Sequence, residues 1–430
     1  MFYKESLLIM RKNNLLFTID AKLIVLYFLI IIFGWISLYS SETNENFFHA
    51  ISFSSQSGKQ IIWFAITFFI VFVLQFLDYR FYLNLAFPLY SLSIILLILV
   101  LLYGVTVSGS KSWISIFDFR FQPSEFAKFS TALFLSSFLV NRHHYQFLFN
   151  NKFFAYFIIF FPFILILIQG DFGTSLIFFS FMIVLYRYKD VSTKFIVLLI
   201  SFISLFILGI VLNNISLIVI ILLVALFSIG ISINNYRRIF QIIIIAFSSL
   251  IILQGQNFIL NNVLKSHHKN RIVSFFNPNV DPLGSSWNVT QSKIAIGSGG
   301  LFGKGFLQGS QTRFDFVPRQ STDFIFSVIG EEFGFIGSVL FIFLYSFFLI
   351  RLLNLAEIQK DKFSMLYGYS VFSLFFFHYC LNVAMSMGLF PVIGIPLPLV
   401  SYGGSSVFSF SILFFVFLRL NSYQSTILRR

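Results

Sequence analysis

The chain has 430 residues, of which 58% are hydrophobic and only 10% are charged. A soluble protein carries roughly 25% charged residues to cover its surface, so most of this chain must face lipid. The composition excludes a secreted disulfide scaffold, a disordered chain and, despite a net charge of +13, a nucleic-acid binder. The lone Cys380 excludes an intramolecular disulfide and a cysteine-based metal site. We therefore expect an all-α polytopic membrane protein.

Twelve segments are apolar enough for membrane-spanning helices, which need about 20 residues each. They are 22–40, 60–77, 82–104, 124–140, 153–169, 174–188, 195–212, 215–233, 239–255, 325–350, 365–386 and 402–420. The sixth segment is short, and only Asn213 and Asn214 separate the seventh from the eighth, so ten or eleven spans are an open alternative. Lys and Arg residues collect in the short loops on one side, which predicts that both termini are cytoplasmic.

Hydropathy divides the chain into a cytoplasmic N-terminus, two sets of spanning helices around one large extracytoplasmic loop, and a cytoplasmic tail. The five parts are 1–21, 22–255, 256–321 for the loop, 322–420 and 421–430. The loop contains seven Lys or Arg residues and two Asp residues. Long loops cross a membrane regardless of charge, so these cations need no function. The alternative is a basic surface that holds an anionic substrate such as a pyrophosphate.

The loop contains five glycines between positions 297 and 305, which allow close backbone approach or positive φ angles. This run matches neither the Walker pattern nor the dinucleotide fingerprint, so it is weak evidence for a phosphate site. Asp281 and Asp315 are the only carboxylates of the loop and hence its candidate general bases. Both also have structural interpretations, Asp281 as a turn residue before Pro282 and Asp315 as a solvated charge.

Several charged residues lie at the ends of apolar segments or inside them. Glu125 and Lys128 are i,i+3 neighbours that can pair on one helix face. Asp171 follows Gly170, and Asp323 stands at the start of an apolar run. Glu331 and Glu332 lie within that run. A charge at the bilayer centre costs about 2.5–3.5 kcal/mol on insertion scales, so we expect these residues to face a cavity, the bundle interior or each other.

Taken in order along the chain, these motifs resemble the SEDS family, the RodA and FtsW polymerases of bacterial peptidoglycan. The resemblance rests on the blocks Lys111–Trp113, Gln122–Lys128, Asp171–Thr174, Asp281–Gly284, Gln291–Gly300, Thr322–Glu332, Asn382–Gly388 and Pro391–Ser405. The glycine-rich run and residues 397–401 are more similar to the elongation-type branch than to the division-type branch.

The resemblance implies a peptidoglycan glycosyltransferase that polymerises lipid II into β-1,4 glycan strands at the outer face of the membrane during cell elongation. It implies that Asp281 is the general base and that undecaprenyl pyrophosphate is the leaving group. The implied partners are a class B penicillin-binding transpeptidase, the elongation complex and the undecaprenyl carrier, and the implied cofactor is a divalent cation, Mg or Mn. The implied substrate-binding residues are Lys111, Trp113, Glu125, Lys128, Arg271, Gln291, Ser292, Lys293, Lys304, Asp323 and Ser401.

The sequence departs from the family pattern at a few positions. Gly170 stands where Pro is usual, Arg319 where Glu is common, and His267 and His268 where Tyr-Gln is frequent. The family has ten spans, so we expect an extra helical pair within 195–233.

Three other functions stay open: a division-type paralogue, a lipid II flippase and a scaffold without catalysis. A flippase needs its key charges near the membrane midplane. Here the basic and glycine-rich features concentrate in one outer loop, which favours an enzyme that acts on one side.

Overall fold

The computed structural model describes residues 20–42, 55–107, 109–116, 119–141, 151–211, 214–232, 235–258, 266–277 and 284–427. Within it the chain forms two compact units. The first contains Met1–Tyr188 and Val289–Arg430, and the second contains Lys189–Asn288.

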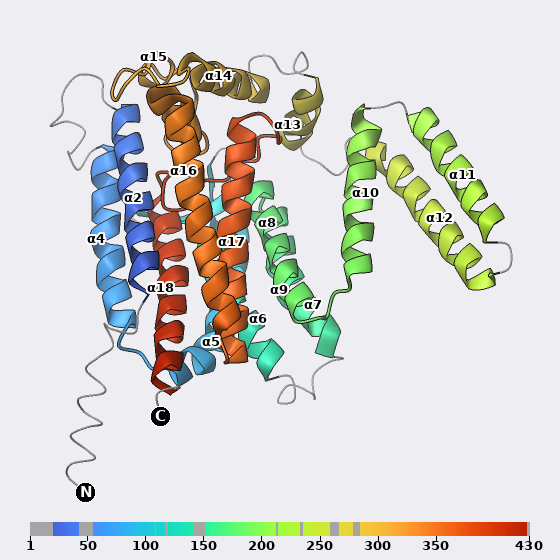
Figure 1. Cartoon of the computed structure of the whole chain (residues 1–430), viewed down its shortest axis with the longest axis horizontal. Helices are drawn as coiled ribbons and strands as arrows, with labels where there is room; N and C mark the ends of the chain where they lie inside the picture. Colours follow the sequence, from blue (N-terminus) through green and yellow to red (C-terminus); the bar gives the residue numbers. More distant parts are fainter. Residues whose placement is uncertain are drawn as a thin grey trace, which may run out of the picture. The chain divides into compact units, whose positions relative to one another are not determined.

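The first unit is a bundle of long helices with two short helices at one end (Figure 1). Its helices before the second unit are α2 (Ala21–Glu42), α4 (Gln56–Leu74), α5 (Tyr79–Tyr103), α6 (Pro123–Val140), α7 (Asn151–Ile168), α8 (Phe172–Ile177), the 3-10 turn η3 (Phe178–Phe181) and α9 (Met182–Arg187). Those after it are α14 (Ser285–Ser298), which starts in the second unit, α15 (Ser310–Arg313), α16 (Ile325–Ile358), α17 (Lys362–Ser386) and α18 (Gly404–Ile427).

In the described residues of the second unit, all regular secondary structure is helical. They are α10 (Thr193–Val211), α11 (Asn214–Ile231), α12 (Tyr236–Phe258) and α13 (Ser266–Phe276). Helix α12 packs against both α10 and α11. Gly209 permits the first of these contacts, because a Cβ there would meet the side chain of Gln256 at 2.1 Å.

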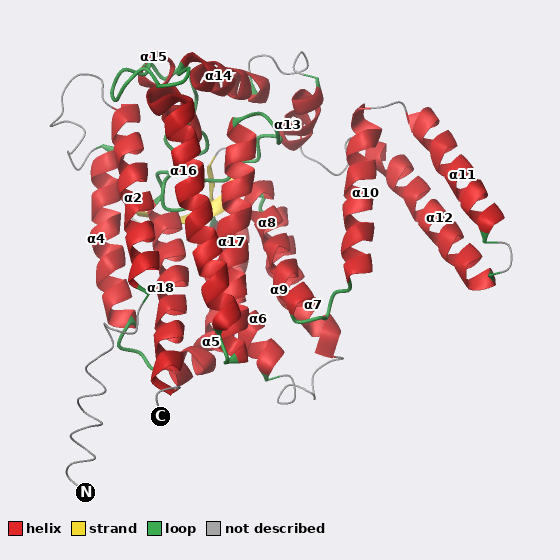
Figure 2. Cartoon of the chain, in the orientation of Figure 1, coloured by secondary structure: helices red, strands yellow, loops and turns green. Residues whose placement is uncertain are grey.

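The predicted fold class is confirmed, since each of the twelve predicted spans falls on helix. The sixth is broken into α8, η3 and α9, as its short length suggested. Seven helices of the described residues are long and apolar enough to cross a membrane. The sequence analysis did not predict a small antiparallel sheet, coloured yellow in Figure 2. Its strands, in the order β1-β2-β3, are β1 (Val105–Val107), β2 (Ser110–Ile116) and β3 (Phe119–Phe121).

Helix α6 forms the centre of the first unit, with contacts to α5, α7, α17 and α18. Almost all of its side chains are buried, including its serines. Two of these satisfy their hydroxyl groups inside the bundle: Ser130 donates to Ser93 Oγ at 2.7 Å, and Ser136 donates to the carbonyl of Ala132. A helix buried on every side needs such internal partners, because no water reaches its polar groups.

Polar contacts join the start of α2 and the ends of α16 and α18 at one end of the unit. Asp20 forms an ion pair with Arg351, and Gln359 donates to Asn421 at 2.5 Å. The start of α2 and the end of α18 therefore lie at the same end of the bundle, opposite α14 and α15 (Figure 1).

Candidate functional site

The glycine-rich run packs against a break in α16. At Gly334 the helix has φ 65° and ψ −161°, which interrupts its hydrogen bonding. The run supplies replacement partners: the amide of Phe335 donates to the carbonyl of Gly300 at 2.9 Å, and the amide of Gly305 donates to the carbonyl of Glu332 at 3.0 Å. A Cβ on residue 299 would lie 2.1 Å from the carbonyl oxygen of Gly330. These glycines thus serve contact between two backbones.

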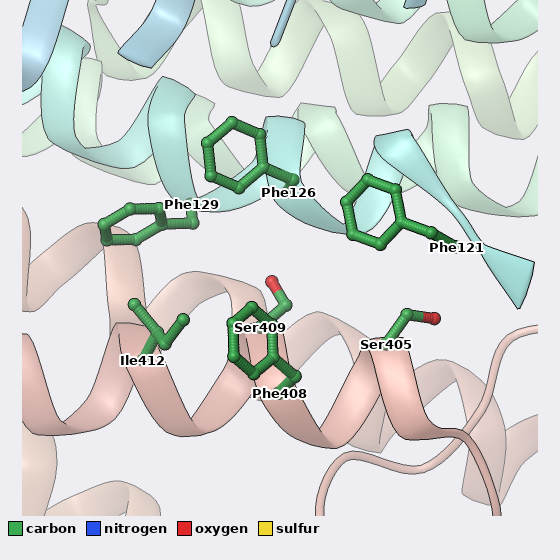
Figure 3. A pocket seen from close by; sticks show the side chains of 7 residues that line it. All are labelled: Phe121, Phe126, Phe129, Ser405, Phe408, Ser409 and Ile412. Carbon is green, nitrogen blue, oxygen red and sulfur yellow. The ribbon is translucent and has the colours of Figure 1, made fainter. Parts of the chain in front are cut away.

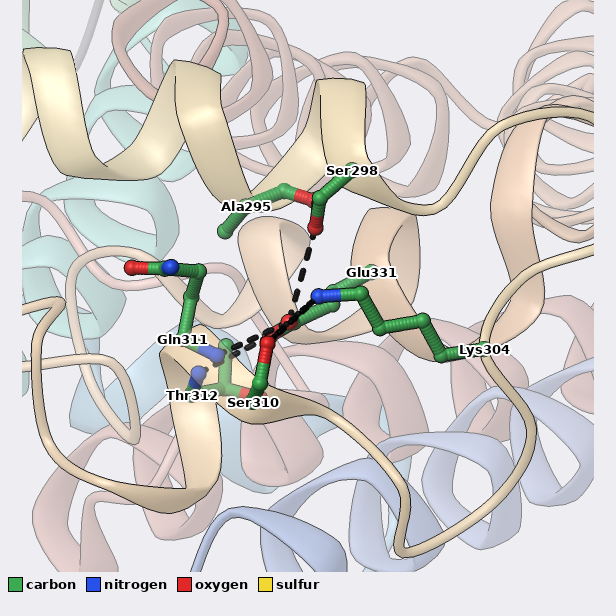
Figure 4. A network of polar contacts seen from close by, with 7 residues as sticks. All are labelled: Ala295, Ser298, Lys304, Ser310, Gln311, Thr312 and Glu331. Carbon is green, nitrogen blue, oxygen red and sulfur yellow. Dashed lines mark hydrogen bonds and ion pairs between the residues drawn. The ribbon is translucent and has the colours of Figure 1, made fainter.

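The carboxylate of Glu331 fastens the next part of the loop to α16 (Figure 4). One carboxylate oxygen accepts from Lys304 Nζ at 2.6 Å and from the amide of Gln311 at 2.8 Å. The other accepts from the amide and the hydroxyl of Thr312, both at 2.8 Å. Glu331 is fully buried, so these bonds and the Lys304 charge compensate its desolvation.

A second buried ion pair lies in the centre of the bundle. Lys128 donates to Glu125 at 2.7 Å, and neither side chain is more than 2% exposed. The same ammonium lies 3.0 Å from Nε2 of His378 on α17 and 4.8 Å from the ring centre of Phe410 on α18. The predicted pairing of Glu125 and Lys128 is correct. Their burial favours a bracing role for these two residues over direct contact with a substrate.

Residues 388–403 form a non-helical segment between α17 and α18 that is mostly buried from Val392 to Ser401. Asn382 donates to the carbonyls of Asp323 and Ile395, at 2.8 and 2.7 Å. Ser401 donates to the carbonyl of Thr322 at 2.5 Å and accepts from the amide of Leu397. Two of the predicted motifs, around Asp323 and Ser401, are therefore bonded to each other. Irregular backbone is tolerated at such depth only where protein satisfies it.

The predicted residues of α14 lie beside the start of this segment. Ser292 is buried and donates to the carbonyl of Ser386 at 2.7 Å, and Gln291 is also buried. Lys293 is exposed, and a Cβ on Gly388 would meet its Cε at 2.1 Å. The lysine stem thus lies over the backbone of Gly388, and its ammonium forms no ion pair with a described residue.

Lys111 and Trp113 both lie on β2. The ammonium of Lys111 donates to the carbonyls of Leu101 and Leu102, each at 2.9 Å, and so caps the C-terminus of α5. Trp113 is half-buried and pairs with Val105 of β1.

Asp171 is the N-cap of α8. It accepts from the amide of Thr174 at 3.2 Å and from Gln122 Nε2 at 2.8 Å. Burial raises the pKa of the Asp171 carboxyl, and its hydrogen bonds from Thr174 act in the opposite direction. Two residues further on, a Cβ on Gly173 would meet the carbonyl oxygen of Ile393 at 2.3 Å. The Asp171 motif is thus packed directly against the 388–403 segment.

Asp315 of the loop and Asp323 at the start of α16 both have polar partners. Asp315 is exposed, has φ 56°, and accepts from Gln320 Nε2 at 2.8 Å. Asp323 lies 3.5 Å from Arg319. The predicted base Asp281 lies outside the described residues. Arg271 is on α13 in the second unit.

The comparisons with known proteins agree with this arrangement. The model of the FtsW, RodA and SpoVE family of cell cycle proteins matches residues 20–213 and 188–426. The chain belongs to this family. The predicted SEDS membership is therefore confirmed.

Two curated relatives are both named as peptidoglycan glycosyltransferases. The peptidoglycan glycosyltransferase RodA of Treponema pallidum (strain Nichols) is 33% identical over 415 residues, which cover 91% of this chain and 94% of that protein. The peptidoglycan glycosyltransferase MrdB of Escherichia coli (strain K12) is 31% identical over 319 residues, 74% of this chain and 73% of that protein.

Solved structures have the same fold. One chain, from a study of how a peptidoglycan synthase complex coordinates polymerization and crosslinking, aligns with a TM-score of 0.66 at 24% identity and covers 94% of this chain and 98% of its own length. The rod shape determining protein RodA of Thermus thermophilus aligns with a TM-score of 0.56 at 23% identity, over 94% of this chain and 97% of its own.

Two departures from the family pattern have clear structural consequences. Gly170 has φ 81°, an angle that the ring of proline forbids. The turn before Asp171 therefore has a backbone that the usual family residue could not adopt. Arg319 faces Asp323 and adds an ion pair at the mouth of α16. His267 and His268 fall on α13.

His378 is a buried polar residue of the bundle that was not predicted from the sequence. A histidine in the apolar middle of a predicted span was a signal of the same kind as Glu125 and Lys128. Its partners come from α6 and from the 388–403 segment, and no local pattern identifies them.

Proposed function

We propose that this chain polymerises lipid II into glycan strands at the outer face of the cytoplasmic membrane, as an elongation-type enzyme. Its class, a peptidoglycan glycosyltransferase, was predicted from the sequence and is confirmed by the named activities of the RodA and MrdB relatives. The observation that carries the proposal is that the loop and its neighbouring motifs meet at one end of the first unit. There α14, the Thr322–Asp323 motif and the 388–403 segment are bonded to one another or to α17.

In the proposed reaction Asp281 removes the proton from the 4-hydroxyl of the acceptor's N-acetylglucosamine. The freed oxygen attacks the anomeric carbon of the donor's N-acetylmuramic acid, and undecaprenyl pyrophosphate departs from the opposite face. The step inverts the anomeric configuration. One carboxylate base and an oxocarbenium-like transition state are the same physics as in inverting glycosidases.

The departing pyrophosphate needs a nearby cation to stabilise its developing charge. Among the predicted cations of the first unit, Lys128 is buried beside Glu125, Lys304 is paired with Glu331, and Lys111 caps α5. Lys293 is exposed and unpaired among the described residues, and it lies on α14, which follows the Asp281 motif along the chain. We therefore assign Lys293 to the pyrophosphate, and Arg271 stays a prediction from the resemblance.

The polyprenyl tails require an apolar surface that is open to lipid. A small apolar pocket lies between β3, α6 and α18 (Figure 3). Four phenylalanines and Ile412 supply most of its lining, and the only polar side chains in it are two serines; the residues are Phe121, Phe126, Phe129, Ser405, Phe408, Ser409 and Ile412. We propose that one tail packs at this pocket, which must widen to admit it, because burial of the tail's methylene and methyl groups supplies binding energy.

A divalent cation remains a proposal from the resemblance. The described residues contain no group of three His, Cys, Asp or Glu side chains that could hold a metal. Glu331 and Asp323 already face Lys304 and Arg319, so they do not fit as its ligands.

Further proposals concern topology and partners. The cation bias of the loops supports cytoplasmic termini. A class B penicillin-binding transpeptidase and the elongation complex are the proposed partners, supported by the likeness to a chain from a polymerising and crosslinking complex. We propose α10 and α11, which cover the 195–233 region, as the extra pair.

The test is a polymerisation assay with labelled lipid II, the purified chain and its transpeptidase, whose own polymerising activity must be absent. We expect glycan ladders that require the native chain. Absence of ladders, combined with transport of lipid II across vesicle bilayers, would instead favour a flippase. Absence of both activities in a correctly folded pair would favour a scaffold.

A further inference from the structure

His378 is a fully buried histidine in the middle of α17, with a polar contact at each ring nitrogen. Nδ1 lies 3.2 Å from the carbonyl oxygen of Pro396, and Nε2 lies 3.0 Å from Lys128 Nζ. The edge of the ring meets Phe410 of α18, with 4.8 Å between ring centres and an interplanar angle of 87°. Its position is therefore fixed from three sides.

These partners determine the protonation of the ring. A carbonyl oxygen can only accept, so Nδ1 carries the hydrogen and donates to Pro396. Lys128 is an ammonium that donates to Glu125, so Nε2 must offer its lone pair to the same ammonium. A doubly protonated ring would set an N–H group against an ammonium. His378 is therefore neutral, with its hydrogen on Nδ1.

The result is one continuous line of hydrogen bonds through the bundle. It runs from the Glu125 carboxylate to the Lys128 ammonium, through the His378 ring, to the Pro396 carbonyl. It joins α6 and α17 to the middle of the 388–403 segment. Pro396 has no backbone N–H, so its carbonyl is the only backbone hydrogen-bonding group by which that residue can be held.

The same segment reaches the proposed pyrophosphate site. At its start, the stem of Lys293 lies over Gly388. Near its end, Ser401 bonds to the carbonyl of Thr322, beside Asp323. Between these points Gly394 and Leu399 have φ angles of 72° and 68°. Such an angle is strained for a leucine, and strained backbone keeps its shape only when surrounding contacts hold it.

We propose that His378 is a positioning residue of the glycosyl transfer. Through Pro396 it sets the register of the 388–403 segment against α17, and thereby places Lys293 for the substrate pyrophosphate. This inference rests on the proposed function.

Two substitutions, each of which keeps one of the ring's polar contacts, separate the bond to Pro396 from the bond to Lys128. In His378→Asn, the side-chain amide takes the place of Nδ1 and still donates to Pro396, while Lys128 loses its acceptor. In His378→Gln, the side-chain carbonyl takes the place of Nε2 and still accepts from Lys128, while Pro396 loses its donor. The matched control is Tyr367→Phe, which removes another buried hydrogen bond of α17, to the Leu413 carbonyl at 3.2 Å, outside the segment.

The experiment measures kcat and KM for lipid II, together with thermal unfolding of each purified protein. We expect His378→Gln to raise KM roughly tenfold, the equivalent of one lost hydrogen bond to a buried group, while His378→Asn stays within about threefold of native. Unfolding midpoints should fall by similar amounts in His378→Gln and Tyr367→Phe, and Tyr367→Phe should keep the native KM. Equal KM values for His378→Gln and Tyr367→Phe, or an equal defect in both His378 variants, would overturn the inference. Failure of the native chain to polymerise would instead contradict the proposed function.

Discussion

Gly303 lies so close to Glu332 that a Cβ on the glycine would come within 2.0 Å of the glutamate's carbonyl oxygen. This contact holds the glycine-rich loop against the break in α16 at Gly334. The glycine-rich run, which from sequence alone is loosely typical of a phosphate-binding loop, here supplies hydrogen bonds that a broken helix lacks. The glycine-rich run and α16 are consequently packed together at the end of the bundle where the proposed site lies.

Gly303→Ala should strongly destabilise the protein. Its φ of 82° alone costs an alanine about 1–3 kcal/mol, and the clash with Glu332 adds to this. Thermal unfolding in detergent measures the effect. The matched control is Gly297→Ala, since residue 297 is helical and has open space around a Cβ, so alanine there should be neutral or stabilising. Equal unfolding midpoints for the two variants would contradict the close contact.

Glu331→Gln should also lower stability, because it leaves Lys304 without its counter-charge. Removal of one partner from a buried ion pair costs about 3–5 kcal/mol, and we expect the lower end since Lys304 is 27% exposed. The exposed pair of Arg187 and Glu357 provides the comparison. Glu357→Gln should cost less than about 1 kcal/mol. A larger loss for Glu357→Gln would show that burial does not govern these pairs.

Asp171→Asn should be at least as stable as the native protein at neutral pH. Asparagine caps a helix as well as aspartate does, and it carries no charge to bury. Because burial raises the folded-state pKa of Asp171, the native fold binds its proton more tightly than the unfolded chain does. Stability conferred by this group therefore falls as pH rises from the unfolded value, about 3.9, through the folded pKa.

The advantage of Asp171→Asn should accordingly shrink as the pH is lowered toward 4. Asp171→Ala serves as the control, since it loses the cap and should cost about 1 kcal/mol. Unfolding midpoints measured between pH 4 and 8 check both statements. An advantage that grows toward low pH would have the wrong sign for a raised pKa.

Gly170→Pro should destabilise the protein even though it restores the residue that is usual in the family. Proline fixes φ near −65°, whereas Gly170 has 81°, and the substitution also removes the amide that donates to Leu167. Gly170→Asn should be tolerated better, because asparagine accepts positive φ. A proline variant as stable as the native protein would mean that this turn has the usual family backbone.

Much of the fold follows from the sequence, because lipid imposes helices wherever an apolar run is long enough. The twelve predicted spans fall on helix, and Glu125 and Lys128 pair as their i,i+3 spacing indicates. The short strands at 105–121 were not predicted, because strands of three to seven residues give too weak a periodicity.

The contacts of the site were less predictable, since they join residues far apart in the chain. Nothing in the local sequence indicates that Lys304 is neutralised by Glu331, or that Lys111 caps α5. Lys304 and Lys111 were both predicted to bind the substrate, but their ammonium groups already have partners in the fold. His378 and Lys128 are 250 positions apart, so no local pattern indicates their contact.

The most direct test of the proposed function is the rate of lipid II polymerisation by Asp281→Asn and Asp315→Asn, each with the transpeptidase bound. Loss of a general base typically slows a reaction about 10²- to 10⁴-fold, and we expect this for Asp281→Asn. Asp315→Asn keeps an oxygen that accepts from Gln320, so its rate should stay within about threefold of native. A native rate in Asp281→Asn, or a collapse confined to Asp315→Asn, would contradict the assignment of Asp281 as the base.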